Sequence, residues 1–475
     1  MSDFVTLYPG VYTEKEKALV EKYIADNKAL EERCEIDVQA LVKGKLPKGT
    51  PGVGPAFVAT EAMVRYNNKK YDPENPVLND AEYAKKLGYQ NIIAYPTFGG
   101  HDDTFMIPYP PQARDTLLVN GLNHSFTNYK PVYPGDTLYL ITNARHMTDL
   151  TPPEGSIYRS IAIQSEGSIY NQKGEKVTDV IFRVTENLKI YKDEQKRPKN
   201  PTFADMWEAP NWMKRPAHYY TDKDWEFIKN LWSKEKRQGA KPLYWEDVKI
   251  GDEPTWTVDG PIEESIMPTA PWGMGLGGSR TMKKEIMDPK IFKTMLRGEK
   301  DGIYRLPNKK DYIPPVPDDP ATVQRPPMPM PSKSGGAAID TADIHKATET
   351  RAVLINYFGR DIAIRHIHNW MGDRGWLYNI RWGIMAPETH AAYGKIVPVN
   401  PLAVRFLEKV PKMKGKYVTA HGLTGDLAIV KSYVYDKYVR DGEFFVELAW
   451  WVETIEGDIW EEGGATVKLP SKNVK

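Results

Sequence analysis

Two glycine–acid turns recur at nearly the same interval along the chain. Gly135-Asp136 precedes a long predicted strand, and Gly425-Asp426 does the same 290 positions later. Gly174-Glu175 turns between two predicted strands, and Gly457-Asp458 does the same 283 positions later. Such spacing of strand turns indicates one fold used twice. Each copy is expected to combine a long helix with an antiparallel sheet, because a sheet with one apolar face needs a cover.

Runs of alternating or β-branched residues predict the strands of both copies. In the first copy the clearest are Thr137–His146, Ser156–Glu166 and Val177–Tyr191; in the second they are Thr255–Asp259, Leu427–Tyr438, Glu443–Ile455 and Ala465–Leu469. Capping residues and apolar periodicity predict the helices. These are Thr13–Glu31, Thr60–Asn67, Ala81–Leu87, Asp222–Lys234, Asp288–Leu296 and a buried helix that begins near Gly359.

A chain of 475 residues is too long for one ordinary domain. We expect a helical N-terminal extension over 1–49, a first domain over 50–195, a linker over 196–242 and a second domain over 243–475. The second domain carries a proline-rich insertion near 300–335, and the nine prolines within 307–331 exclude a helix there.

Composition excludes several classes of protein. Lys and Arg number 64 against 63 Asp and Glu, so neither a nucleic-acid partner nor a membrane surface is indicated. The single cysteine, Cys34, cannot form an internal disulfide and fits a reducing compartment. No secretory signal and no apolar run of about 20 residues is visible. A cytoplasmic protein is expected.

An acid and a histidine, Asp340 and His345, lie five positions apart in the segment Asp-Thr-Ala-Asp-Ile-His. A carboxylate and an imidazole that share one water molecule can move its protons, and the ordinary pKa of histidine lies near neutrality. Gly359 follows where a helix could begin, and its free N–H would stabilise negative charge on a carbonyl oxygen. Acid, base and oxyanion donor together suit enolate chemistry on a thioester.

Other groups of residues are weaker candidates. His366 and His368 would point in different directions on a helix, so they cannot hold a metal jointly, and we expect one to be buried and one to face an edge. Asp361 and His366 repeat the five-residue interval but would lie on opposite sides of the helix. His101-Asp102-Asp103 lacks further metal ligands at the required spacing, so no metal site is expected.

The order of helix, central helix and Gly-Asp-led antiparallel sheet resembles the hotdog fold. The local motifs resemble those of MaoC-like (R)-specific enoyl-CoA hydratases, which carry Asp-x-Asn-Pro-x-His. The first copy keeps Asn75-Pro76 but has Pro73 and Leu78 where the family has aspartate and histidine. The second copy keeps the acid and histidine in 340–345 but lacks Asn-Pro. The segment Asn369–Leu377 resembles the central helix of large double-hotdog members.

The resemblance implies an α+β fold with two hotdog domains in one chain, which together form a pseudo-dimer. It implies an acyl-CoA hydratase or dehydratase that interconverts a trans-2-enoyl and a 3-hydroxyacyl thioester. The second domain would catalyse the reaction through Asp340, His345 and Gly359, and the first would help to hold the substrate. Tyr357, Asn75 and Arg360 are the expected substrate contacts.

No metal or redox cofactor is implied, since coenzyme A enters as part of the substrate. A homo-oligomer is expected, because hotdog sheets commonly pair through their edges. The many Trp and Tyr residues favour a bulky or aromatic acyl group. Two alternatives stay open at this point: a hotdog acyl-CoA thioesterase, and a non-catalytic acyl-CoA-binding partner subunit.

Overall fold

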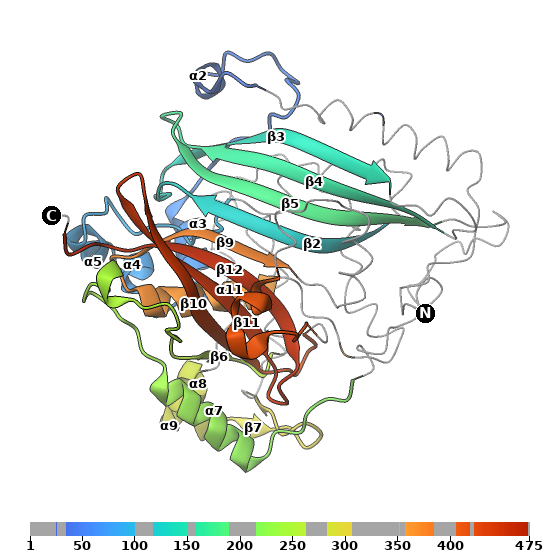
Figure 1. Cartoon of the computed structure of the whole chain (residues 1–475), viewed down its shortest axis with the longest axis vertical. Coiled ribbons are helices and arrows are strands. Elements are labelled where there is room, and N and C mark those ends of the chain that lie inside the picture. The colour runs from blue at the N-terminus through green and yellow to red at the C-terminus, as the bar shows by residue number, and fades with distance from the viewer. Residues whose placement is uncertain are drawn as a thin grey trace.

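Two five-stranded units join into one antiparallel sheet in the structure, a computed structural model (Figure 1). It describes residues 35–99, 117–149, 158–189, 215–262, 283–305, 357–383, 405–418 and 422–473, with residues 25 and 351. The strand order is β1-β3-β4-β5-β2-β9-β12-β11-β10-β6. If the five strands of each unit are numbered along the chain, both units place them in the same order from the outer edge of the sheet inwards: first, third, fourth, fifth, second.

The strands have the following bounds. In the first unit they are β1 Phe57–Val58, β2 Leu117–Asn128, β3 Thr137–Asp149, β4 Tyr158–Tyr170 and β5 Lys176–Lys189. In the second they are β6 Thr257–Asp259, β9 Trp376–Gly383, β10 Ala428–Arg440, β11 Glu443–Glu453 and β12 Ile459–Lys468. A separate small hairpin consists of β7 Leu296–Arg297 and β8 Tyr304–Arg305.

The helices precede or connect these strands. The α-helices are α2 Val38–Val42, α3 Glu61–Tyr71, α4 Pro76–Asn79, α5 Ala81–Lys86, α7 Asp222–Lys234, α8 Lys283–Met287, α9 Pro289–Phe292 and α11 Tyr357–Met371. Three 3-10 helices are Trp245–Asp247, Phe406–Lys409 and Pro411–Met413. None of the helices in the described ranges has the length and apolar character needed to cross a bilayer.

The repeated glycine turns occupy equivalent places in the two units. Gly135 has a φ of +94° and donates its N–H to the carbonyl of Ala59, just after β1. Gly425 has a φ of +89° and donates to the carbonyl of Ile262, shortly after β6. These left-handed conformations suit glycine because it lacks a Cβ. The predicted duplication is confirmed: the chain is an α+β protein with two hotdog domains.

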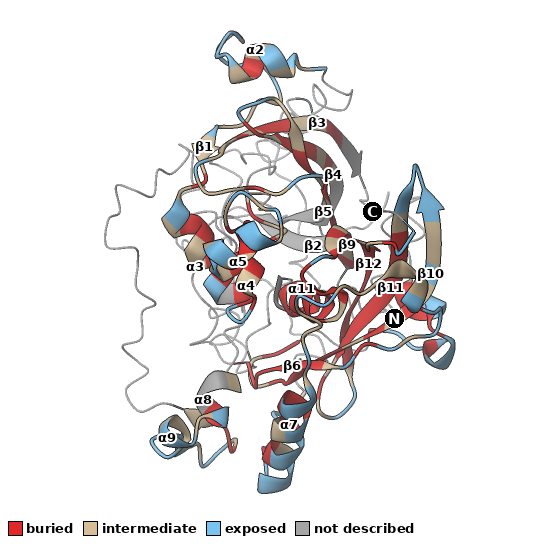
Figure 2. Ribbon diagram, turned by 90° about the vertical axis from the view of Figure 1, so that its left-hand side faces the viewer, coloured by how far each residue is buried: buried red, intermediate tan, exposed pale blue. Residues whose placement is uncertain are grey.

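Helix α11 is the buried helix of the second unit (Figure 2). Ile362, Ile364 and Ile367 are almost completely buried, and the helix contacts β6, β9, β10, β11 and β12. The same apolar core includes residues of the first unit such as Val64 and Tyr95. The two units therefore share one core, which continues across the junction of β2 with β9.

Some predicted elements differ from the structure. The predicted helix Asp288–Leu296 is wrong beyond Phe292, because Leu296 pairs with Arg305 in the β7–β8 hairpin. The segment Asn369–Leu377, which resembled a central helix in sequence, is helical only as far as Met371. Gly372 has a φ of +72°, and Trp376 already belongs to β9. Strand β2 escaped prediction because its Asn-Gly-Leu-Asn-His stretch is polar and lacks a clear period of two. The helix predicted at 13–31 and the proline-rich segment 307–331 lie outside the described residues.

Candidate active site

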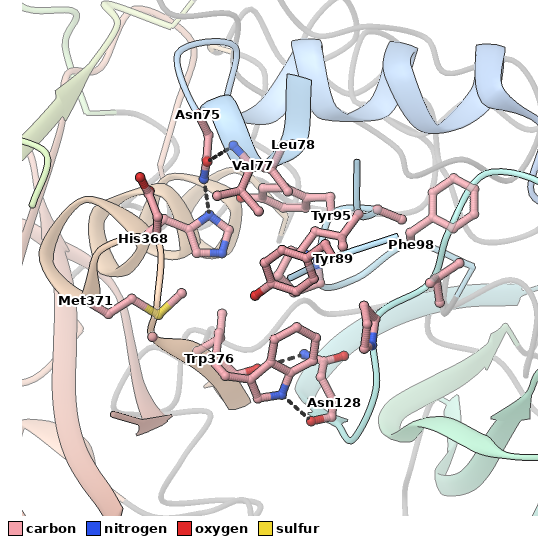
Figure 3. A pocket seen from close by; sticks show the side chains of 18 of the residues that line it. Asn75, Val77, Leu78, Tyr89, Tyr95, Phe98, Asn128, His368, Met371 and Trp376 are labelled. Atoms are coloured by element: carbon pink, nitrogen blue, oxygen red, sulfur yellow. Dashed lines mark hydrogen bonds between the residues drawn. The ribbon is translucent and has the colours of Figure 1, made fainter. Parts of the chain in front are cut away.

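A cavity of about 50 Å³ lies where the two units meet (Figure 3). Its apolar walls come from both units: Val77, Leu78, Ile93, Ala94, Phe98, Val132, Met371 and Leu377. A smaller polar set also lines it: Asn75, Tyr89, Tyr95, Asn128, Lys130, Thr178, His368, Asp373 and Trp376. A concave apolar site with a few convergent polar groups is typical of small-molecule binding.

The connection between α3 and α4 supplies one side of the cavity. Asp72 is the C-cap residue of α3, and Asn75 is the N-cap of α4, followed by Pro76 in its first turn. Asn75 Oδ1 accepts a hydrogen bond from the Val77 N–H at 3.1 Å, which leaves its Nδ2 to donate to Asp72 Oδ2 at 2.9 Å. The Asn-Pro pair thus fixes the position of a buried carboxylate.

His368, near the end of α11, meets this carboxylate from the other unit. Its Nδ1 lies 3.0 Å from Asp72 Oδ2 and 3.5 Å from Asn75 Nδ2. Because an ionised carboxylate can only accept, Nδ1 carries the proton of this hydrogen bond. Nε2 is then the basic nitrogen, and it faces the cavity (Figure 3). Asp72 and His368 are only 1% and 6% exposed.

A half-buried arginine supports the acidic side of the site. Arg237 Nη2 lies 2.9 Å from Asp373 Oδ1, and Arg237 Nη1 lies 3.8 Å from Asp72 Oδ1. Burial by itself would raise the pKa of Asp72, but His368, Arg237 and the Asn75 hydrogen bond together lower this pKa below its ordinary value. Asp72 is therefore ionised at neutral pH, as an orienting partner for an imidazole must be.

Asp340 and His345, the predicted catalytic pair, lie outside the described residues. The structure describes Gly359 in the first turn of α11, where the carboxyl of Glu461 lies against it: a Cβ built on Gly359 would come 1.6 Å from Glu461 Oε2. The Gly359 N–H and the Arg360 N–H face this carboxyl. Gly359 does not line the described cavity.

Of the three predicted substrate contacts, the structure places one at the cavity. Asn75 lines the cavity. Arg360 does not: it is buried, its Nε lies 2.7 Å from Asp361 Oδ1, and its guanidinium lies over the Trp382 ring. Tyr357 begins α11, and its side chain lies outside the described part of the structure.

Sequence reasoning missed Asp72 and His368. The family motif places its acid two positions before asparagine, where this chain has Pro73, whereas Asp72 lies three positions before Asn75. The expectation that one of His366 and His368 faces an edge is wrong, since both are buried. His366 bonds to Thr257 and Ser432, and burial together with the neighbouring Arg365 lowers its pKa to about 3.

The residues 101–103, considered as a metal cluster, lie outside the described residues. Within the part of the chain that the structure describes, no three His, Cys, Asp or Glu side chains gather as metal ligands would.

By its strand order the chain is a double-hotdog protein. No protein-family model matches it. A UPF0336 protein of Streptomyces avermitilis is 26% identical over 154 residues, which cover 30% of this chain and 94% of that protein. A MaoC-like dehydratase is similar in structure, with 13% identity, coverage of 88% of this chain and 99% of that one, and a TM-score of 0.43.

A conserved hypothetical protein of Mycobacterium tuberculosis, described as a double hotdog fold, is also similar, with 9% identity and a TM-score of 0.43. The match covers 90% of this chain and 97% of that chain.

Proposed function

We propose that the protein is a hydratase or dehydratase of acyl thioesters, with coenzyme A as the thiol carrier of the substrate. The observation that carries this proposal is the buried Asp72–His368 pair, with the second imidazole nitrogen facing an apolar cavity. Such a pair can take a proton from water and return it, which addition of water to a conjugated double bond requires. Similarity to a MaoC-like dehydratase agrees with this chemistry.

In the hydration direction, Nε2 of His368 accepts a proton from a water molecule while the water oxygen bonds to C3. The electron pair of the C2–C3 double bond moves towards the thioester carbonyl, which becomes an enolate. The proton on the imidazolium then passes to C2, and a 3-hydroxyacyl thioester results. Dehydration is the same sequence reversed.

Asp72 has the supporting role. Its hydrogen bond to Nδ1 fixes the tautomer and orientation of the ring, and its negative charge stabilises the imidazolium that forms. Tyr95 restricts the ring further, since the two rings meet edge to face at 5.8 Å and the Tyr95 hydroxyl is bonded to the Asp361 carbonyl at 2.8 Å. The base therefore keeps one orientation towards the cavity.

The small cavity favours a short acyl group over a bulky one. Its volume of about 50 Å³ is roughly a third of that of an engineered apolar cavity known to hold benzene. A short chain such as the crotonyl group is therefore the first substrate to test, ahead of the aromatic acyl groups that the Trp and Tyr content suggested.

The test offers a series of trans-2-enoyl-CoA esters to the full chain and follows loss of the conjugated double bond by absorbance. We expect hydration by the wild-type protein and a fall of about 10²–10⁴-fold in His368→Ala. Asp72→Asn should also fall, and the double variant should be little worse than the poorer single variant, because the two residues act as a unit.

His366→Ala is the matched control. It also removes a buried imidazole of α11, but one that bonds to Thr257 and Ser432 and does not line the cavity. It should lose stability while the folded protein keeps its turnover. Full turnover in His368→Ala would refute the assignment. Release of free thiol without a hydroxyacyl product would favour a thioesterase, and binding without any turnover would favour a partner subunit.

A further inference from the structure

Most polar side chains around the cavity are already hydrogen-bonded within the protein. The Tyr95 hydroxyl donates to the Asp361 carbonyl at 2.8 Å. Asn128 Nδ2 donates to the Leu377 carbonyl at 3.3 Å, and Trp376 Nε1 donates to the carbonyl of Asn128 at 2.8 Å. The last two bonds join β2 to β9, and neither the Tyr95 hydroxyl nor the Trp376 indole has a further proton to donate.

The remaining polar groups at the wall are engaged as well. Thr178 Oγ1 donates to the Asn128 side chain at 3.3 Å. Lys130 Nζ donates to Glu175 at 2.6 Å, and Asp373 accepts from the Tyr83 hydroxyl at 2.5 Å. Two polar groups that line the cavity have no hydrogen-bond partner among the described residues: Nε2 of His368 and the hydroxyl of Tyr89.

Tyr89 is held firmly by the end of helix α5. Gly88, with a φ of +98°, ends this helix, and the Tyr89 N–H donates to the Ala84 carbonyl at 3.1 Å. The side chain then crosses into the cavity, and its hydroxyl points into the open space (Figure 3). No hydrogen bond joins this hydroxyl to another residue in the ranges that the structure describes. Its direction is thus set by the backbone and by packing.

The Tyr89 hydroxyl keeps its proton at neutral pH. Burial, followed by the nearby Tyr133 and Asp373, raises its pKa to about 12. A neutral phenol that faces a cavity can donate a hydrogen bond to a bound ligand, and its strongest interaction is with an oxygen that carries negative charge.

We propose that Tyr89 is a catalytic residue whose hydroxyl donates a hydrogen bond to the thioester carbonyl oxygen of the substrate. This inference rests on the proposed function. In the reaction above, that oxygen gains charge as water bonds to C3, so the hydrogen bond is stronger in the enolate than in the substrate. The Gly359 N–H, predicted for this task, faces Glu461 instead. Tyr89 and His368 then approach the substrate at opposite ends of its reacting segment.

The first measurement compares the hydration kinetics of wild type, Tyr89→Phe and Tyr133→Phe. Tyr89→Phe should lower kcat by about 10²–10³-fold, with a much smaller change in KM, as removal of one oxyanion donor does. Tyr133→Phe is the matched control, because it removes a neighbouring phenol that does not line the cavity, and it should keep kcat within about threefold.

The second measurement reports the hydrogen bond itself. In a His368→Ala background, which blocks turnover, 2,4-hexadienoyl-CoA is bound and the absorption maximum of its conjugated thioester is recorded. Donation to the carbonyl should shift this maximum to longer wavelength, and the shift should disappear when Tyr89→Phe is added. A shift that persists without the hydroxyl overturns the proposal.

The outcomes separate this inference from the proposed function. Wild-type turnover in His368→Ala would remove the proposed function. Hydration that is lost in His368→Ala but retained within threefold in Tyr89→Phe would overturn only the role of Tyr89. If Tyr89→Phe does not fold, 3-fluorotyrosine at position 89 keeps the hydroxyl and lowers its pKa. It should then move the alkaline limb of the kcat profile to lower pH, and an unmoved limb overturns the proposal.

Discussion

Nδ1 of His368 lies 3.0 Å from Oδ2 of Asp72, although 296 positions separate the two residues. Asp72 ends α3 in the first unit, and His368 lies in the last turn of α11 in the second. The contact exists because β2 and β9 join the two sheets edge to edge and bring α3 against α11. Neither unit alone contains the pair, so duplication has placed one site at the junction of the units.

The ionised state of Asp72 predicts how stability depends on pH. Its pKa in the folded protein is lower than the ordinary value of about 3.9, because the contributions of His368 and Arg237 outweigh burial. The folded state therefore binds fewer protons than the unfolded state. The stability from this carboxylate is complete above the ordinary pKa and is lost as the pH falls through the lower folded-state value.

Asp72→Asn cannot ionise and should lack this contribution. Urea unfolding should show a deficit relative to wild type of about 2 kcal/mol at pH 7, which shrinks as the pH falls below about 4. Asp441→Asn is the control, because Asp441 is an exposed turn residue with a φ of +53°, a conformation that asparagine also adopts. A deficit that is equally large at pH 3 and pH 7 would contradict the assigned charge state of Asp72.

The close contact between Gly359 and Glu461 predicts that substitutions at these two residues have non-additive effects on the unfolding free energy. A Cβ on Gly359 would come 1.6 Å from Glu461 Oε2 and 2.5 Å from its Cδ, and Glu461 is completely buried. Gly359→Ala should therefore lower the unfolding free energy by about 1–3 kcal/mol. Glu461→Ala removes both atoms and leaves only its own Cβ, 3.3 Å away.

In the Glu461→Ala background, Gly359→Ala should cost far less than it does in the wild type. Burial raises the pKa of Glu461 well above its ordinary value, against the opposing charge of Arg360. Chemical unfolding of the four proteins in this cycle measures the coupling. Additive effects would show that the helix start tolerates a side chain without displacing Glu461.

Local patterns predicted much of the sheet because its strands and turns follow local rules. Helix Asp222–Lys234 was predicted with its true bounds, since Thr221 and Asp224 form a capping box and Trp225, Ile228 and Trp232 line one face. The glycine turns at 135 and 425 were visible because their left-handed backbone favours one residue type. Strand β2 was not visible, since its pairing with β5 and β9 depends on distant partners.

The site could be predicted only in part for the same reason. Asn75-Pro76 is a local capping motif, so the sequence shows it directly. The partnership of Asp72 with His368 depends on the junction of the two units, and no local spacing reports it. His366 and His368 look alike in sequence, yet one faces polar side chains of β6 and β10 and the other faces the cavity.

Trp376 predicts which acyl groups the cavity admits. Its indole forms one wall of the cavity, held by the hydrogen bond from Nε1 to the Asn128 carbonyl at 2.8 Å (Figure 3). Replacement by leucine removes much of this wall while the backbone of residue 376 stays paired with Lys468. Trp376→Leu should raise kcat/KM for an octenoyl or cinnamoyl thioester, relative to crotonyl, by about 10-fold or more, because even one methylene is worth 10–200-fold in a tight pocket.

Trp245→Leu is the matched control for this change. Trp245 is also half-buried and also donates from Nε1 to a backbone carbonyl, that of Phe445 at 2.9 Å, but it does not line the cavity. Trp245→Leu should leave the preference between chain lengths unchanged. A change caused by general loosening of the structure would instead appear in both variants. If wild type and Trp376→Leu show the same preference between chain lengths, the acyl group binds elsewhere. If the preference changes in Trp376→Leu and not in Trp245→Leu, the far end of the acyl group lies against the Trp376 indole.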